Sequence, residues 1–245
     1  MLTNTHSANH LAAIVGLLIT LSLAAVCSGE ESKPPERVLR HAAFFKFKDG
    51  TGDADIAKVL SDFAALPTKI DSIKGYQAGK NISPLGLDDG YTHCFLLTVD
   101  DEAGRTKYFR HPADKEFGRF MRPLLEKVFV VDYWGKPEKA KQNRQLKHAL
   151  FLKFKKSTTE EQVKNVEETI AKLPAQSETV RAFEWGRNNS PEKYSDGFTH
   201  CFMFTFDDPA GVKADAETAA HKAALEKIMA VAEKGRVFDF WTAEE

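Results

Sequence analysis

The chain has 245 residues, and its 34 Lys and Arg nearly balance its 35 Asp and Glu, which gives a formal net charge of −1 at pH 7. This balance argues against the basic surface that nucleic-acid binding requires, so we expect no nucleic-acid partner. Hydrophobic residues make up 42% of the chain and 18 are Phe, a composition typical of packed cores and not of a disordered chain.

The first thirty residues differ in composition from the rest. Residues 11–26 are almost wholly apolar, a length typical of a signal-peptide core and short for a transmembrane helix. We assign 1–29 to a signal peptide or hydrophobic leader and 30–37 to a polar linker, and expect a secreted or periplasmic protein with no integral membrane domain beyond the leader. Cys27 follows Leu-Ala-Ala-Val as in a bacterial lipobox, so a lipid anchor at Cys27 is the alternative.

Beyond the leader, the sequence is duplicated. Residues 90–95 read Gly-Tyr-Thr-His-Cys-Phe and residues 197–202 read Gly-Phe-Thr-His-Cys-Phe, an offset of 107 (197 − 90). The same offset pairs His41 with His148 and Asp132 with Asp239. The recurrence indicates an internal repeat, and we place repeat one at 38–135, a linker at 136–146 and repeat two at 147–242.

Each repeat contains the same order of expected elements. Near-continuous apolar runs predict strands, and apolar residues at intervals of three and four predict helices. Thr158 and Glu161 form a capping-box pattern, and Pro67 and Pro174 end the first helices. Strands are expected at 41–47, 73–80, 91–99 and 129–134 and at 148–154, 180–187, 198–206 and 237–241, and second helices at 107–126, with a break at Pro112 as an alternative, and at 214–233.

The order β-α-β-β-α-β predicts an α+β fold with two ferredoxin-like repeats. Such a repeat covers only one face of its sheet with helices, yet the expected strands are apolar on both faces. Two copies in one chain solve this problem if their sheets pack face to face. We therefore expect an intramolecular dimeric α/β barrel, a monomer that is internally a pseudo-dimer, with higher assembly left open.

Taken together, the His that opens strand one, the Gly-Tyr-Thr-His strand and the segment 108–113 (Tyr-Phe-Arg-His-Pro-Ala) resemble the stress-responsive dimeric α/β barrel (Dabb) family. The resemblance covers both repeats. It implies that single domains, which pair as dimers in this family, are here fused in tandem. One enzyme of the family is a cyclase that closes a linear polyketide without metal or cofactor, so the resemblance implies no cofactor. His93, His111 and Asp114 could offer metal ligands, but their spacing matches no standard zinc pattern and repeat two lacks the set, so we expect no metal site.

The resemblance also implies candidate residues on the strands. The strand-one His of the family corresponds to His41 and His148, which we take as ligand-binding candidates. The strand-three His corresponds to His93 and His200, which we take as catalytic candidates. The alternative for all four is a structural role, in which the imidazole hydrogen-bonds backbone groups and fixes the end of a strand.

Further catalytic candidates lie on the second helix. The family's Tyr corresponds to Tyr108 in repeat one, and its counterpart in repeat two is Asp215. In the family's cyclase the catalytic base is the second His of a His-Pro-Ala-His motif, and the resemblance places this position at Asp114 in repeat one, after His111, and at His221 in repeat two. Neither repeat therefore carries a complete cyclase site, and His221 alone is equally typical of a solvated helix residue.

Three functions remain open at this point. One is a barrel that binds a small apolar ligand in a His-lined cavity. Another is a cofactor-free cyclase, isomerase or oxygenase-type enzyme in which the same histidines move protons. The third is a non-catalytic structural or stability module. Cys94 and Cys201 occupy equivalent positions, as buried thiols or, alternatively, as a disulfide.

Overall fold

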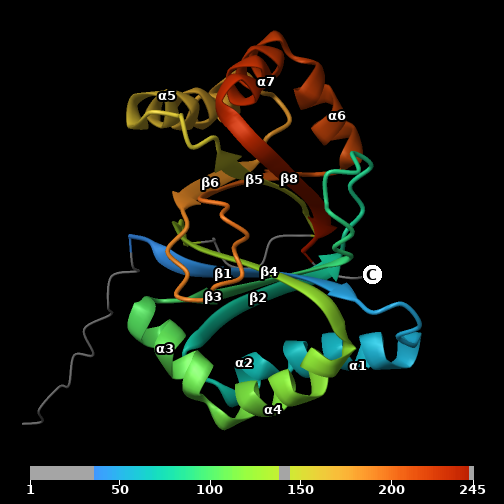
Figure 1. Cartoon of the computed structure of the whole chain (residues 1–245). Helices are drawn as coiled ribbons and strands as arrows, with labels where there is room; N and C mark the ends of the chain where they lie inside the picture. Colours follow the sequence, from blue (N-terminus) through green and yellow to red (C-terminus); the bar gives the residue numbers. More distant parts are fainter. Residues whose placement is uncertain (1–35, 138–143, 243–245) are drawn as a thin grey trace, which may run out of the picture. The chain divides into compact units, whose positions relative to one another are not determined.

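The computed structural model describes residues 36–137 and 144–242, which contain both repeats (Figure 1). The leader at 1–29 and Cys27 lie outside the described residues. Repeat one consists of β1 (Val38–Phe47), α1 (Asp53–Ala64), α2 (Leu66–Lys69), β2 (Ile73–Lys80), β3 (His93–Val99), α3 (Glu102–Arg110), α4 (Pro112–Met121), a 3-10 helix η1 (Arg122–Leu124) and β4 (Leu125–Gly135). Repeat two consists of β5 (Leu146–Phe154), α5 (Glu160–Ala171), a 3-10 helix η2 (Leu173–Gln176), β6 (Ala182–Arg187), β7 (His200–Phe206), α6 (Pro209–Glu217), α7 (Ala219–Val231) and β8 (Ala232–Trp241).

Each repeat forms one antiparallel sheet. The strand orders are β2-β3-β1-β4 and β6-β7-β5-β8, so the first strand of each repeat lies between the third and the last. This is the ferredoxin-like arrangement expected from the order of elements, and it confirms the α+β fold class. The register places His41 opposite Asp132 and His148 opposite Asp239.

The capping box of α5 begins one residue later than expected. The Thr159 hydroxyl accepts from the Gln162 amide at 3.3 Å, and the Gln162 side chain accepts from the Thr159 amide at 2.9 Å. Gln serves the same role as Glu in this motif, so two overlapping patterns compete and the Thr159 pattern is the one used.

The second helix of each repeat begins earlier than expected and is divided in two. Asp101 and Asp208 cap α3 and α6, because each carboxylate accepts a hydrogen bond from a backbone amide in the first turn. The division falls before Pro112 in repeat one and at Thr218 in repeat two. Thr218 is a cap too, since its hydroxyl accepts from the amide three residues on.

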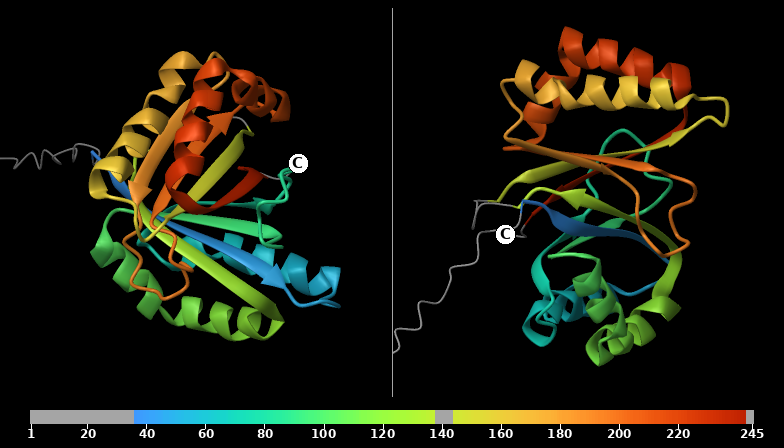
Figure 2. Two further views of the ribbon diagram at one scale, coloured as in Figure 1. Left: turned by 45° about the horizontal axis from the view of Figure 1, so that its top comes forward. Right: turned by 90° about the vertical axis from the view of Figure 1, so that its left-hand side faces the viewer.

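Each sheet is buried on both faces. In β1, Phe45 faces the helices of its own repeat, whereas Phe44 faces the sheet of repeat two. The ring of Phe44 stacks on Phe238 with centroids 4.2 Å apart and meets Phe151 edge-on at 5.1 Å. The two sheets thus share one aromatic core and form the intramolecular α/β barrel expected from the sequence, with helices on the two outer faces (Figure 2).

The edges of the two sheets approach closely at a pair of equivalent glycines. A Cβ added at Gly79 in β2 would lie 2.8 Å from the carbonyl oxygen of Trp241 in β8. One added at Gly186 in β6 would lie 2.9 Å from the Cβ of Tyr133 in β4. Both distances are shorter than van der Waals contact, so only glycine lets β2 lie against β8 and β6 against β4.

Arg236 lies where equivalent residues of the two repeats meet. Its guanidinium donates to Asp89 at 2.8 Å and to Asp196 at 3.1 Å, and these two aspartates are equivalent at the offset of 107. Its own equivalent is Phe129, and the guanidinium lies 4.2 Å from the centre of that ring. A buried cation and an aromatic ring therefore form an unlike pair at the pseudo-two-fold axis.

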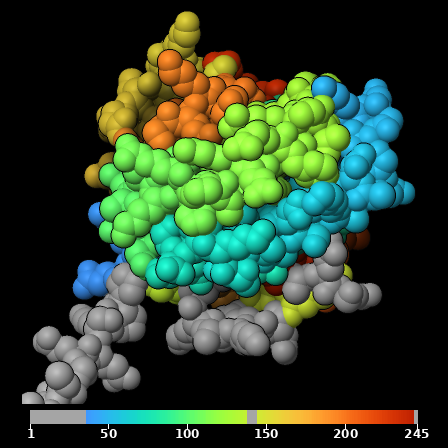
Figure 3. Space-filling view, turned by 90° about the horizontal axis from the view of Figure 1, so that it is seen from below, coloured from blue at the N-terminus to red at the C-terminus, as the bar shows by residue number. Residues whose placement is uncertain are grey.

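The loop after the second strand of each repeat reaches the last strand of the other repeat. The Asn189 amide donates to the Asp132 carbonyl at 2.8 Å, and the Val130 amide donates to the Tyr194 carbonyl at 3.1 Å. Figure 3 shows orange atoms of repeat two lying against green atoms of repeat one on this side of the molecule. The loop of repeat one reciprocates, with bonds from the Ile82 amide to Asp239 and from the Val237 amide to Leu87.

Cys94 and Cys201 are fully buried free thiols, so the disulfide alternative is not realised. No helix within the described ranges is long and apolar enough to span a membrane.

Candidate ligand-binding site

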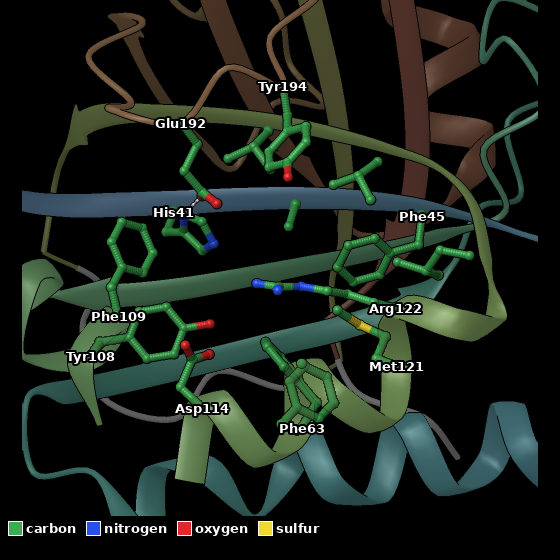
Figure 4. Close-up of a pocket in the computed structure, with 16 residues that line it drawn as sticks. His41, Phe45, Phe63, Tyr108, Phe109, Asp114, Met121, Arg122, Glu192 and Tyr194 are labelled. Atoms are coloured by element: carbon green, nitrogen blue, oxygen red, sulfur yellow. Dashed lines mark ion pairs between the residues drawn. The ribbon is translucent and has the colours of Figure 1, made fainter. Parts of the chain in front are cut away.

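Repeat one contains a cavity of about 140 Å³ between its sheet and α4 (Figure 4). Its wall is mostly aromatic and aliphatic, whereas one end carries the side chains of His41, Tyr108, Asp114 and Glu192. Arg122 extends across the middle toward this polar end. The apolar wall comprises Ala43, Phe45, Phe63, Phe109, Phe117, Met121, Leu125, Val128 and Val130.

A chain of three side chains holds His41 in place. The Nδ1 atom of His41 lies 2.8 Å from Oδ1 of Asp132, its neighbour across β1 and β4. Oδ2 of the same carboxylate accepts from Arg105 of α3 at 2.8 Å. Because a carboxylate only accepts, Nδ1 carries the proton, and Nε2 is the nitrogen left to meet a ligand.

The charges in this chain support one another. Burial works to raise the pKa of Asp132, but His41 and Arg105 outweigh it and hold that pKa below its usual range. Burial likewise works to lower the pKa of His41, but Asp132, with smaller contributions from Glu192 and Asp114, raises it above its ordinary value. For His41 the neighbouring carboxylates together outweigh the effect of burial on the ring.

Tyr108 and Asp114 meet where α3 gives way to α4. Burial raises the pKa of the Tyr108 hydroxyl well above its ordinary value, with a further contribution from Asp114, to which it hydrogen-bonds. Burial also raises the pKa of Asp114, and the bond from Tyr108 offsets this only in part. His111 does not line the cavity: its Nδ1 accepts from the Ala113 amide at 3.1 Å and so caps α4.

Repeat two completes the cavity of repeat one. Glu192 and Tyr194 lie in its loop and form the wall opposite Tyr108 and Asp114 (Figure 4). The loop is held by the two backbone bonds to β4 and by Arg105, which also donates to the side-chain oxygen of Asn189 at 3.0 Å. The site is thus built from both halves of the pseudo-dimer.

Comparison with known proteins places this architecture in a family. The sequence model of the stress-responsive A/B barrel domain (Dabb) matches residues 39–135 and, a second time, residues 146–242. The chain belongs to the Dabb family. The two matches also confirm the tandem duplication.

Curated relatives resemble a single Dabb repeat. The stress-response A/B barrel domain-containing protein HS1 of Arabidopsis thaliana is 35% identical over 104 residues, which is 42% of this chain and 93% of the relative. Olivetolic acid cyclase of Cannabis sativa is 28% identical over 95 residues, 39% of this chain and 94% of the relative.

A solved structure resembles both Dabb repeats together. A candidate monooxygenase from Fusobacterium nucleatum superposes with a TM-score of 0.59 at 10% identity, over 86% of this chain and 94% of that one. At this identity the likeness concerns the fold alone.

The second Dabb repeat keeps only part of the site. His148 bonds Asp239 at 2.6 Å, as His41 bonds Asp132, and His221 bonds Asp215 at 3.0 Å. The position of Arg105 is taken by Val212. The equivalents of Glu192 and Tyr194 are Leu85 and Leu87, which are 55% and 49% exposed.

The strand-three histidines do not line the cavity. His93 contacts Thr92 at 2.9 Å, and burial, helped by Lys80, lowers its pKa to about 4. His200 has the equivalent contact with Thr199 and lies 2.9 Å from Glu167 of α5. Burial lowers the pKa of His200, although Glu167 works against it. The structure therefore brings His41, Tyr108 and Asp114 together and leaves His93 and His200 elsewhere.

Arg105, Asp132, Glu192 and Arg122 are site residues that sequence reasoning did not single out. Asp132 had a signal, because an acidic residue recurs at the same place in both apolar last strands. The other three have apolar counterparts in the other repeat (Val212 and Met229 in repeat two, Leu85 in repeat one), so the repeat offered no signal for them. No group of three or more His, Cys, Asp or Glu side chains in residues 36–137 and 144–242 is arranged to hold a metal ion.

Proposed function

We propose that the first Dabb repeat binds a small molecule with an apolar body and one polar group. The cavity carries this proposal, because its wall is apolar while its hydrogen-bonding side chains gather at one end. A volume of about 140 Å³ suits a molecule with one aromatic ring, since a cavity of roughly 150 Å³ accepts benzene. Such a ligand would direct its polar group to His41.

An NMR titration with p-cresol tests the binding site. Signals from residues around the cavity should shift in the wild type, and Ala43→Leu should abolish the shifts because Leu fills the space. Repeat two itself has Leu150 at the equivalent position, so this substitution suits the backbone. Leu150→Ala is the matched control and should leave binding unchanged. If Ala43→Leu binds p-cresol as the wild type does, the ligand site is not this cavity. That result would favour a non-catalytic structural role for the barrel.

An enzyme that moves a proton is the second candidate. The observation in its favour is the His41–Asp132–Arg105 chain, which resembles the way catalytic bases are oriented. The similarity of one repeat to a cyclase supports the same reading, although Asp114 stands at the position of the cyclase base. Solvent exchange of the methyl protons of acetophenone in D₂O would report on this activity. His41→Gln should reduce the rate of proton exchange to that in buffer, and His148→Gln is the control. A wild type that exchanges these protons no faster than buffer would contradict the enzyme proposal.

We also propose that the protein is exported, on the strength of the apolar segment at 11–26. Mass spectrometry of the mature N-terminus should find a chain that begins after the leader, or one lipidated at Cys27. A chain that retains Met1 would contradict export.

A further inference from the structure

Three carboxylates surround His41, and they differ in how fully they are paired. Asp132 is bonded to both His41 and Arg105, and Asp114 takes the Tyr108 hydroxyl. Within the described part of the chain, the carboxylate of Glu192 has one ion pair, with Nδ1 of His41 at 3.9 Å. That distance is too long for a hydrogen bond, so Glu192 keeps its accepting capacity for another partner.

Glu192 is nevertheless held in a defined place. Its loop is bonded to β4 on both sides, through Asn189 and Tyr194, and its own amide donates to the Ser190 hydroxyl at 3.3 Å. Its side chain lines the cavity and is 31% exposed, so it is partly shielded from solvent. A fixed acceptor at the polar end distinguishes ligands by what they offer to it.

Groups of both signs face this end. The His41 ring and the Arg122 guanidinium lie with the Asp114 and Glu192 carboxylates around the cavity, while Asp132 and Arg105 pair with each other. Burial raises the pKa of both Asp114 and Glu192, although His41 and Arg122 work against it. A ligand carboxylate would meet two carboxylates of like charge. A hydroxyl group would instead donate to Glu192 and accept from Nε2 of His41.

We propose that Glu192, supplied by repeat two, is the specificity-determining residue of the cavity in repeat one and selects ligands with a hydrogen-bond-donating hydroxyl over ligands with a carboxylate. The inference rests on the proposed binding function and names the ligand class for it. The substitution that tests this is Glu192→Leu, because repeat one itself has Leu85 at the position equivalent to Glu192 (192 − 107).

The test measures the affinities of p-cresol and benzoate, two probes of similar size, by isothermal titration at pH 7. The wild type should bind p-cresol roughly tenfold tighter than benzoate, the ratio expected of one hydrogen bond to a charged group. Glu192→Leu should bind p-cresol about tenfold more weakly than the wild type. It should bind benzoate more tightly, because His41 and Arg122 then face one carboxylate, Asp114, in place of two. Glu192→Gln keeps the size of the side chain without its charge and should give an intermediate ratio.

Glu161→Gln is the matched control, since it removes one exposed charge from α5 outside the cavity and should leave the ratio unchanged. If both probes bind and Glu192→Leu preserves the wild-type ratio, the role of Glu192 is refuted while the binding site stands. If neither probe binds the wild type, the binding site is refuted and the selection with it.

Discussion

Replacing Phe44 by Ala tests whether the two repeats form one cooperative unit. Phe44 is 1% exposed and lies between the sheets, in ring contact with Phe129, Phe151 and Phe238. Truncating a Phe in such a place removes its apolar contacts and leaves a cavity, at a cost of about 3–5 kcal/mol. For a chain of this size, each kcal/mol lowers the melting temperature by about 2–4 °C, so Phe44→Ala should melt about 6–20 °C lower.

Urea unfolding followed by far-UV circular dichroism and by Trp fluorescence measures this loss. Trp134 reports on repeat one and Trp185 on repeat two, so single-Trp variants distinguish the halves. Both halves should lose stability together in Phe44→Ala, since the ring packs against repeat two. Leu225→Ala, at a 47% exposed position of α7, is the control and should change the unfolding free energy by less than about 0.5 kcal/mol. Unfolding of repeat two at its wild-type midpoint in Phe44→Ala would refute the shared core.

Three further predictions concern titratable groups. Asp132→Asn should lower the pKa of His41, measured by NMR, because burial then acts on the ring without the opposing carboxylate; an unchanged pKa would show that Asp132 does not set it. His93 should titrate near pH 4, and since its folded pKa lies below the ordinary histidine value of 6.5, the unfolding free energy falls as pH drops from 6.5 to about 4. His93→Gln should make that fall smaller, and an identical pH profile would contradict the assignment. Burial raises the pKa of both Cys94 and Cys201, so iodoacetamide should label neither until the chain unfolds, and rapid labelling of the native protein would count against their burial.

The fold followed from the sequence because the repeat doubled every signal. A strand run such as 41–47 is ambiguous by itself, but its recurrence at 148–154 identified it as an element of a duplicated unit. The apolar character of both strand faces then required a second layer, which the other repeat supplies. The predicted helix ends were less accurate than the predicted strands. The start of α5, for example, depends on which of two adjacent hydroxyls accepts a hydrogen bond from the first turn, and Thr159 does so in place of Thr158.

The site was predicted only where it follows from local sequence. His41, Tyr108 and Asp114 come from neighbouring elements of one repeat, and the resemblance to the Dabb family pointed to all three. Glu192 reaches the same cavity through a loop that crosses to the other half, and nothing in its own segment indicates that crossing. The placement of His93 away from the cavity is likewise a matter of which face of β3 it occupies and of its contact with Thr92.

The pairing of Arg236 with Phe129 shows what covalent fusion permits. In a dimer of identical chains, a residue on the symmetry axis meets its own copy, so a buried guanidinium there would confront a second one. In a fused chain the two equivalent positions are encoded separately, so they can carry different residues. Glu192 and Leu85 illustrate the same independence: at equivalent positions of the two loops, one residue is a carboxylate that lines a cavity and the other is an exposed apolar side chain.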